Sequence, residues 1–245
     1  MVERCSLPDT ARHVRKMCAR LSEGKLLKSP IAERSDFARY VRDMLLLGEP
    51  VRLLLYWGCS SSASFGPREK AYIQYLKCVI NAIQEGGQTP TTLHALFTDT
   101  HSEINAVARE TYLDYYLETA GALGRENWSF SYLSELPGCA DIISGEVPPR
   151  TGSFKRLSDI LLSDARRLYG EERAEGRMEA YLAANLRESA EIKRRWPLGC
   201  FFHPGVPELK YMLPSLPMLY GYTNLQRSSR KPWFAISQSS DRKEA

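Results

Sequence analysis

The stretch that decides the fold is Val51-Arg-Leu-Leu-Leu-Tyr-Trp57, followed by Gly58-Cys-Ser-Ser-Ser-Ala-Ser-Phe-Gly66-Pro67. Its first seven residues are apolar and rich in strand formers, whereas the residues after Trp57 are small and mostly polar. Beyond Pro67, apolar residues recur at helical spacing as far as Gly86-Gly87. The pattern predicts a buried strand, a small-residue loop and a crossover helix.

The same order of elements recurs downstream. Leu93–Phe97 is a second apolar run, and it stops at the acidic turn Thr98-Asp-Thr-His101 before a helical pattern that closes near residues 121–124. Further strands are expected at 128–133, 199–202, 218–223 and 232–236, and further helices at about 154–169 and 171–195. This layout predicts an α/β fold, a Rossmann-like sheet with crossover helices. Because right-handed crossovers bring successive strand ends together, loop 58–66 and turn 98–101 are expected at one edge of the sheet.

An N-terminal segment precedes this sheet. Residues 8–48 show helical spacing in two stretches that Ser29-Pro30 separates, and the segment is either a packing layer or a lid over the sheet. We therefore expect three parts: a helical segment or lid at 1–49, a catalytic Rossmann-like domain at 50–236, and a disordered tail at 237–245.

Composition excludes several classes of protein. The chain has 245 residues, 43% of them hydrophobic, and a formal charge of +4 that is too small and too evenly spread for a nucleic-acid binder. No apolar run approaches the roughly 20 residues that cross a bilayer, and residues 1–25 carry charge throughout. We expect a cytoplasmic protein with a small-molecule substrate and neither a nucleic-acid nor a membrane partner. The oligomeric state stays open.

Cysteine and histidine usage indicates neither a metal site nor a disulfide framework. The six cysteines are scattered without a CxxC pair, and the four histidines do not lie at metal-ligand spacing. We therefore expect no metal.

The first candidate site is the end of the first strand. Tyr56, Trp57, Gly58, Cys59 and Ser60 combine two aromatic residues with small ones that let backbone amides approach a ligand. Neither GxGxxG nor a P-loop is present, so ordinary NAD or ATP chemistry is disfavoured. A serine-rich turn without function remains the alternative.

The second candidate site follows the second strand and consists of Asp99, Thr100, His101 and Asn105. A carboxylate at this place accepts hydrogen bonds from ribose hydroxyls in α/β nucleotide binders. The alternative is structural, since Thr100 and Glu103 fit a capping box and Asp99 favours a helix amino terminus.

A third candidate lies on the helix near 178–196. Tyr181, Asn185 and Glu188 fall on one edge, beside an apolar stripe that includes Met178 and Leu182. They either line a site or form a solvated flank. Aromatic residues are frequent near the predicted strand ends, and ring faces hold cations such as a sulfonium well.

Three segments carry a resemblance: Leu53-Leu-Leu-Tyr-Trp-Gly-Cys59, Phe97-Thr-Asp-Thr-His-Ser-Glu-Ile-Asn105, and Pro217-Met-Leu-Tyr-Gly-Tyr222 with Lys231-Pro-Trp-Phe234. Over about residues 50–235 the chain resembles the small S-adenosylmethionine cyclases known as azetidine-2-carboxylate synthases, whose fold is similar to class I methyltransferases. It bears a weaker resemblance to the isonitrile synthases of the pyoverdine and dityrosine group.

The first resemblance implies that S-adenosylmethionine is the substrate and that its α-amine attacks its own γ-carbon, which expels methylthioadenosine. Under this implication Asn185 and Tyr222 position the amine, Tyr56 and Trp57 face the sulfonium, and Asp99 binds the ribose. The implied catalytic residues are Asn185, Tyr222 and Tyr56, and the implied binding residues are Trp57, Gly58, Cys59, Ser60, Asp99, Thr100, His101, Asn105, Tyr181 and Glu188. The alternatives are a small-molecule methyltransferase, an isonitrile-synthase-like enzyme and a non-catalytic interaction protein that docks through residues 8–48.

Overall fold

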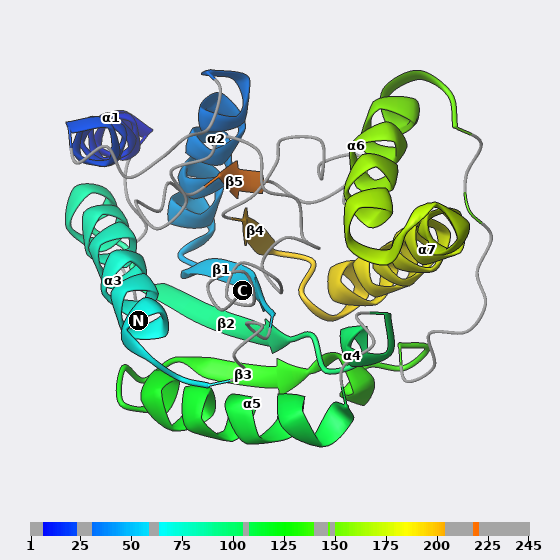
Figure 1. The fold of residues 1–245 in the computed structure, drawn as a ribbon. Coiled ribbons are helices and arrows are strands. Elements are labelled where there is room, and N and C mark those ends of the chain that lie inside the picture. Colours follow the sequence, from blue (N-terminus) through cyan, green and yellow to red (C-terminus); the bar gives the residue numbers. More distant parts are fainter. Residues whose placement is uncertain are drawn as a thin grey trace.

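The computed structural model describes residues 7–23, 31–58, 64–104, 108–139, 147, 150–203 and 218–220 of the chain (Figure 1). Its elements are, in order, α1 (Leu7–Glu23), α2 (Ile31–Leu47), β1 (Val51–Trp57), α3 (Pro67–Gly87), β2 (Thr91–Phe97), α4 (His101–Ile104), α5 (Arg109–Gly124), β3 (Ser129–Tyr132), the 3-10 helix η1 (Leu133–Glu135), α6 (Gly152–Tyr169), α7 (Glu171–Arg195), β4 (Gly199–His203) and β5 (Met218–Tyr220).

The described strands form one parallel sheet in the order β3-β2-β1-β4-β5. β1 pairs with β2 from Val51↔Thr91 to Trp57↔Phe97, and on its other side Leu53 pairs with Cys200 of β4. The predicted Rossmann-like α/β fold is therefore confirmed. Because the chain passes from β1 to β2 on one side and returns as β4 on the other, the strand order reverses between β1 and β4. In open α/β sheets this reversal marks the place where ligands bind, outside the carboxyl ends of the strands.

The two ends predicted to share an edge do so. The backbone N–H of Thr98, just after β2, donates to the carbonyl of Trp57 at the end of β1 (3.2 Å). Gly58 lies next to the same threonine, because a Cβ built on it would be 3.7 Å from Thr98 Oγ1. Loop 58–66 and turn 98–101 therefore begin at one edge of the sheet.

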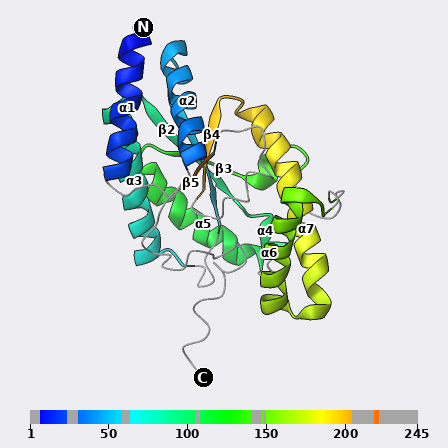
Figure 2. The same ribbon diagram turned by 90° about the horizontal axis from the view of Figure 1, so that it is seen from above.

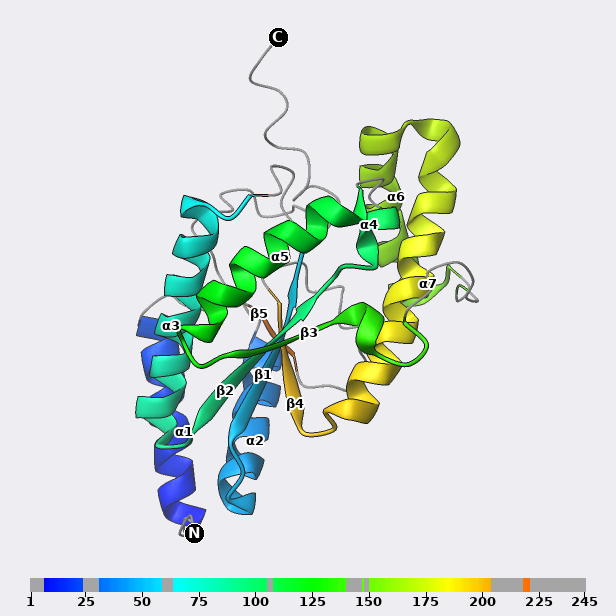
Figure 3. The same ribbon diagram turned by 90° about the horizontal axis from the view of Figure 1, so that it is seen from below.

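Helices cover both faces of the sheet (Figure 3). On what we call the α3 face, Leu53, Leu55 and Trp57 of β1 pack with residues of α1, α2, α3 and α5. On the opposite α7 face, Leu54 and Tyr56 pack with η1, α6 and α7. Since successive side chains of a strand point to opposite faces, neighbouring residues of β1 belong to different cores.

The N-terminal helices α1 and α2 pack on the α3-face layer. Met17 of α1 and Val41 of α2 are fully buried there, and Figure 2 shows both helices on the side of the molecule opposite α6 and α7. The hydroxyl of Tyr40 accepts a hydrogen bond from the N–H of Arg52 (3.0 Å) and donates one to the carbonyl of Leu198 (2.8 Å), so α2 is tied to β1 and to the residue before β4. These contacts are those of a packing layer, and a lid role stays a prediction.

One predicted helix needs correction, and two predicted segments lie outside the described residues. The helix predicted to run from the acidic turn to residues 121–124 is instead α4 and α5, with residues 105–107 outside the described part. The predicted strand 232–236 and tail 237–245 are outside it as well.

The described residues contain no membrane-spanning helix and no disulfide. None of their helices has the length and apolar composition that crossing a membrane requires. No disulfide bond joins the cysteines among them, which are Cys18, Cys78, Cys139 and Cys200.

Candidate active site

A buried chain of polar side chains lies on the α7 face at the carboxyl end of β1. The hydroxyl of Tyr56 donates to Glu188 Oε2 (2.9 Å), and His101 Nε2 lies 2.8 Å from Glu188 Oε1. Tyr56 comes from β1 and is 8% exposed, Glu188 comes from α7 and is 2% exposed, and His101 comes from α4 and is 3% exposed. An ionised carboxylate only accepts hydrogen bonds, so Nε2 of His101 carries the proton that joins it to Glu188. We call these three residues the Glu188 cluster.

The sequence places each member for a simple reason. Tyr56 alternates with Trp57 along β1 and therefore faces α7, while His101 opens α4 directly after the turn that ends β2. On α7, Tyr181, Asn185 and Glu188 are spaced by four and three residues, and all of them are buried. They lie within the buried face of the helix rather than beside it, so the solvated-flank alternative is wrong.

Asn185 lies between Tyr181 and Glu188 on α7. Its side-chain N–H donates to the carbonyl of Tyr181 (2.8 Å), one turn earlier. This bond fixes the amide nitrogen toward the helix backbone, and the side-chain oxygen is the acceptor that the group offers to a ligand.

Aromatic rings surround the Glu188 cluster. The ring of Tyr56 meets Phe201 edge to face with centroids 4.9 Å apart, and His101 meets Tyr181 in the same way at 5.6 Å. Burial raises the pKa of Tyr56 well above its usual value, and the nearby Glu188 carboxylate raises it further. The pKa of Tyr181 is raised by the same two causes. Both phenols therefore stay neutral at physiological pH and act as hydrogen-bond partners rather than bases.

The residues on either side of His101 carry hydroxyls that the fold does not use. Thr100 is 6% exposed and Ser102 is 1% exposed, and neither hydroxyl has a hydrogen-bond partner among the residues the structure describes. The capping-box interpretation of Thr100 and Glu103 is therefore wrong, because Thr100 Oγ1 makes no capping bond. The first turn of α4 is held by backbone bonds instead, from His101 N to Thr98 O (3.0 Å) and from Ser102 N to Asp99 O (3.2 Å).

Asp99 is fully buried and its carboxylate has partners within the protein. Oδ1 accepts from the backbone N–H of Ser134 (3.1 Å), and Oδ2 accepts from Nη2 of Arg109 (3.3 Å). The carboxylate thus caps η1 rather than α4. A bond from Asp99 to ribose stays a prediction, and it would use an oxygen that already has a partner.

Trp57 belongs to a different chain of polar groups, on the α3 face. Its indole N–H donates to the hydroxyl of Tyr115 (3.0 Å), which donates to Glu69 Oε1 (3.4 Å). The other oxygen of Glu69 accepts from the N–H of Gly66 (2.9 Å). The structure places Trp57 and Tyr56 on opposite faces of the sheet. The expectation that both rings face one sulfonium is therefore wrong. The alternation of side chains along β1 is the reason.

The remaining expected residues divide into two groups. Gly58 is exposed, and a Cβ on it would meet only ordinary contact at Thr98 Oγ1, so no close approach requires glycine there. Four expected residues lie outside the described part of the chain: Cys59, Ser60, Asn105 and Tyr222. Sequence reasoning missed Ser102 and Phe201. Ser102 was signalled by its place beside His101, whereas Phe201 looked like any apolar residue of a strand.

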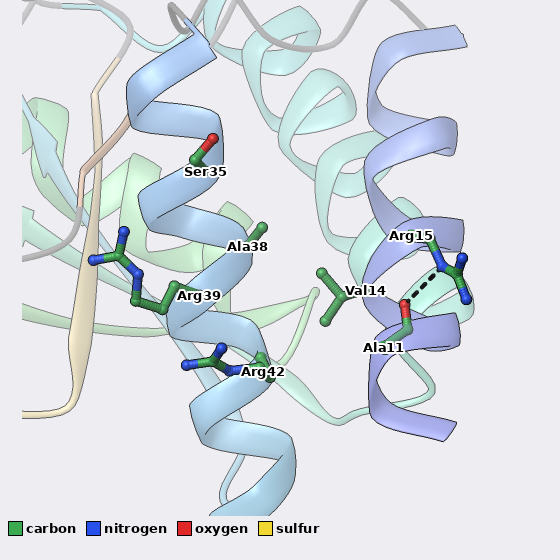
Figure 4. A pocket seen from close by; sticks show the side chains of 7 residues that line it. All are labelled: Ala11, Val14, Arg15, Ser35, Ala38, Arg39 and Arg42. Atoms are coloured by element: carbon green, nitrogen blue, oxygen red, sulfur yellow. Dashed lines mark hydrogen bonds between the residues drawn. The ribbon is translucent and has the colours of Figure 1, made fainter. Parts of the chain in front are cut away.

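A groove of about 580 Å³ lies elsewhere, between α1 and α2 (Figure 4). Val14 points between the two helices, while Arg39 and Arg42 extend away from α1. Both arginines pair with acidic residues of their own helix, Arg39 with Asp36 (3.2 Å) and Arg42 with Asp43 (2.8 Å). The groove shares no residue with the Glu188 cluster. The described residues include no group of three or more His, Cys, Asp or Glu side chains placed to hold a metal ion.

Comparison with known proteins gives a fold and no family. No family model matches the chain, and no curated protein matches it. Its structure is similar to the PvcA protein from Pseudomonas aeruginosa, with a TM-score of 0.66 and 11% sequence identity over 89% of this chain and 87% of that one. This likeness shows a shared Rossmann-like fold.

Two further solved structures are similar at a TM-score of 0.45. One is the tryptophanyl-tRNA synthetase of the archaeon Aeropyrum pernix K1, at 15% identity over 92% of this chain and 66% of that one. The other is a tryptophanyl-tRNA synthetase homolog from Entamoeba histolytica, at 10% identity over 89% of this chain and 59% of that one. At this score neither contributes to the assignment.

Proposed function

We propose that the chain is an enzyme that consumes S-adenosylmethionine and closes its amino-acid side chain to azetidine-2-carboxylate, with methylthioadenosine as the second product. The observation that carries the proposal is the buried Glu188 carboxylate, which holds His101 and Tyr56 at the carboxyl end of β1, where the strand order reverses. Substrates of open α/β enzymes bind outside this edge. The resemblance of three sequence segments to S-adenosylmethionine cyclases supplies the reaction.

The reaction needs a proton acceptor. The α-amine loses a proton and its lone pair attacks the γ-carbon, the bond from this carbon to sulfur breaks, and its electrons leave with sulfur as a neutral thioether. Overall, one proton is released for each substrate. The imidazole of His101 is the proton acceptor of the cluster, because its Nε2 is bonded to Glu188 at 2.8 Å and its second ring nitrogen has a lone pair in this tautomer. An oriented acceptor of this kind contributes roughly 10²–10⁴-fold in rate.

The other residues of the cluster orient the substrate and exclude water. Tyr56 is a neutral donor that fixes the second carboxylate oxygen of Glu188, and the side-chain oxygen of Asn185 is an acceptor for a donor group of the substrate. The rings of Tyr181 and Phe201 give the apolar surroundings in which a ring face attracts a sulfonium by about 2 kcal/mol. Tyr222, which lies outside the described residues, stays a proposed contact of the substrate.

Product analysis tests the proposal. We expect the full-length chain, incubated with S-adenosylmethionine alone, to form azetidine-2-carboxylate and methylthioadenosine in equal amounts by mass spectrometry. Formation of S-adenosylhomocysteine with an added acceptor would indicate a methyltransferase instead. If the chain neither binds nor converts S-adenosylmethionine, the proposal is wrong.

A matched pair of variants connects the activity to the cluster. Glu188→Gln is expected to lower the single-turnover rate by about 10²-fold or more, because the amide does not stabilise an imidazolium. Glu69→Gln changes a carboxylate that is also buried and also bonded to a tyrosine, but on the α3 face, so its rate should stay near that of the wild type. Equal losses in the two variants would indicate a general effect on folding and remove Glu188 from the mechanism.

A further inference from the structure

Thr100 and Ser102 differ from the buried hydroxyl residues Thr119 and Ser158. Thr119 Oγ1 donates to the carbonyl of Tyr115 (2.8 Å), and Ser158 Oγ donates to the carbonyl of Phe154 (2.9 Å). Thr100 Oγ1 and Ser102 Oγ are equally enclosed, yet no described residue offers them a partner. The two residues that carry these hydroxyls precede and follow His101 in the chain.

Such groups are costly in a folded protein. A buried hydroxyl without a partner loses its bond to water and destabilises the fold by about 1–3 kcal/mol. Native structures therefore contain few of them, and each one calls for an explanation such as a bound water, an ion, a ligand or a catalytic role. Two within three residues, beside a histidine bonded to a buried glutamate, indicate a polar ligand group at this point.

The charges around these hydroxyls select the kind of group. Asp99 precedes Thr100 in the chain, and Glu188 is bonded to His101 between the two residues, so the segment 99–102 carries one buried carboxylate and binds a second. The counterion described for Asp99 is Arg109, whose Nη2 lies 3.3 Å from Asp99 Oδ2 and whose side chain is 54% exposed. A second anion would be repelled here, whereas a group that donates hydrogen bonds and carries positive charge is attracted.

We propose that Thr100 Oγ1 and Ser102 Oγ accept hydrogen bonds from the α-amine of the substrate and turn its lone pair toward the γ-carbon. This inference rests on the proposed function and names the residues that bind the reacting nitrogen. The ammonium enters as a cation between the two hydroxyls and His101, gives one proton to the imidazole, and keeps its remaining N–H bonds to the hydroxyl oxygens. Thr100 and Ser102 are thus positioning groups that contact the nucleophile, while His101 takes the proton.

Isosteric variants separate this role from a structural one. Thr100→Val and Ser102→Ala remove a hydroxyl that the unliganded protein does not use, so the unfolding midpoint in urea should stay unchanged or rise. The controls Thr119→Val and Ser158→Ala remove hydroxyls that do have partners, so their midpoints should fall. If Thr100→Val and Ser102→Ala lower the midpoint as much as the controls do, the hydroxyls are structural and the inference is wrong.

Three ligands identify the group that is bound. S-adenosylmethionine has an amine and a carboxylate, its decarboxylated form has the amine alone, and methylthioadenosine has neither. Each of the two variants should weaken binding of the first two ligands about fivefold or more and leave methylthioadenosine unaffected, by isothermal titration. Weakened binding of S-adenosylmethionine alone would place the carboxylate there and overturn the assignment to the amine.

The same titrations distinguish the two proposals. If wild-type protein binds none of the three ligands, the proposed function fails, and the inference drawn from it fails with it. If the wild type binds and converts S-adenosylmethionine while Thr100→Val and Ser102→Ala do so equally well, the function stands and the inference alone is wrong. In the expected case the single-turnover rate falls by more than the affinity does, because a misdirected lone pair slows the attack.

Discussion

Tyr56 and Glu188 are 132 positions apart in the chain, and a buried hydrogen bond of 2.9 Å joins them. The bond connects the end of β1 to α7, and it fixes the carboxylate that also holds His101. A strand end, a helix and the turn after β2 are thereby held in one arrangement before any ligand binds.

This bond predicts energetic coupling between the two residues. The variants Tyr56→Phe and Glu188→Met each remove one partner, and a double-mutant cycle in urea should give an interaction energy of about 0.5–3 kcal/mol. The matched cycle of Tyr56→Phe with Glu69→Gln joins residues of opposite faces that share no partner, so those effects should add within about 0.5 kcal/mol. An additive Tyr56–Glu188 cycle would contradict the bond.

The second prediction concerns Asp99, which was expected from the sequence to bind ribose. Asp99→Ala leaves the N–H of Ser134 and the guanidinium of Arg109 without their carboxylate, so unfolding free energy should fall by about 1–3 kcal/mol. Because both oxygens already have partners, we expect methylthioadenosine still to raise the melting temperature of the variant. A variant with unchanged stability and no response to the nucleoside would instead establish the ribose bond.

The sheet could be predicted from the sequence because its signals are local. The run Val51–Trp57 is apolar, short and followed by small residues, and the helix beyond Pro67 is amphipathic, so each element is recognisable within a few residues. The joint edge of Gly58 and Thr98 then follows from the handedness of crossovers. Strand order does not follow in this way, since the side of β1 on which β4 lies depends on how α6 and α7 pack.

The site was predictable only in part, for the same reason. The spacing of Tyr181, Asn185 and Glu188 places them on one side of a helix, but only the tertiary packing shows that this side meets Tyr56 and His101. The pairing of Trp57 with Tyr56 ignored the alternation of strand side chains, which is itself a local rule. That the hydroxyls of Thr100 and Ser102 have no described partner could not be predicted from the sequence, because hydrogen-bond partners depend on the tertiary fold.

The third prediction is a dependence of stability on pH through His94. This residue of β2 lies between Ser129 of β3, whose hydroxyl is 2.8 Å from Nδ1, and the ring of Trp196. Burial lowers the pKa of His94 from 6.5 to about 4, and the charge of Arg195 acts in the same direction. Between these two values the unfolded chain binds a proton that the folded chain does not, so stability falls as pH drops from 6.5 toward 4.

The variant His94→Gln removes this titration. In urea unfolding at about pH 7 and about pH 4.5, the loss of stability should be smaller in the variant by about 1–2 kcal/mol, after allowance for the partial exposure of the ring. Carboxylates titrate in both proteins and cancel in the difference. Equal losses would mean that the imidazole is protonated in the folded protein at the lower pH.

The last prediction concerns the contact between α1 and α3. A Cβ on Gly86 of α3 would lie 2.7 Å from the backbone N of Met17 and 3.0 Å from its Cβ, so the two helices approach at a point where only glycine fits. Gly86→Ala gains about 1 kcal/mol of helix propensity, but the backbone of α1 must move, and overpacking of this kind costs about 1–3 kcal/mol. The control is Gly176→Ala on α7, where a Cβ meets nothing within 4 Å, so that variant should be stabilised by about 0.5–1 kcal/mol. Urea unfolding should therefore show changes of opposite sign. Relative to the wild type, Gly86→Ala should accelerate hydrogen exchange more at the amides of α1 than at those of β1. Stabilisation by both substitutions would mean that α1 does not rest on α3 at this point.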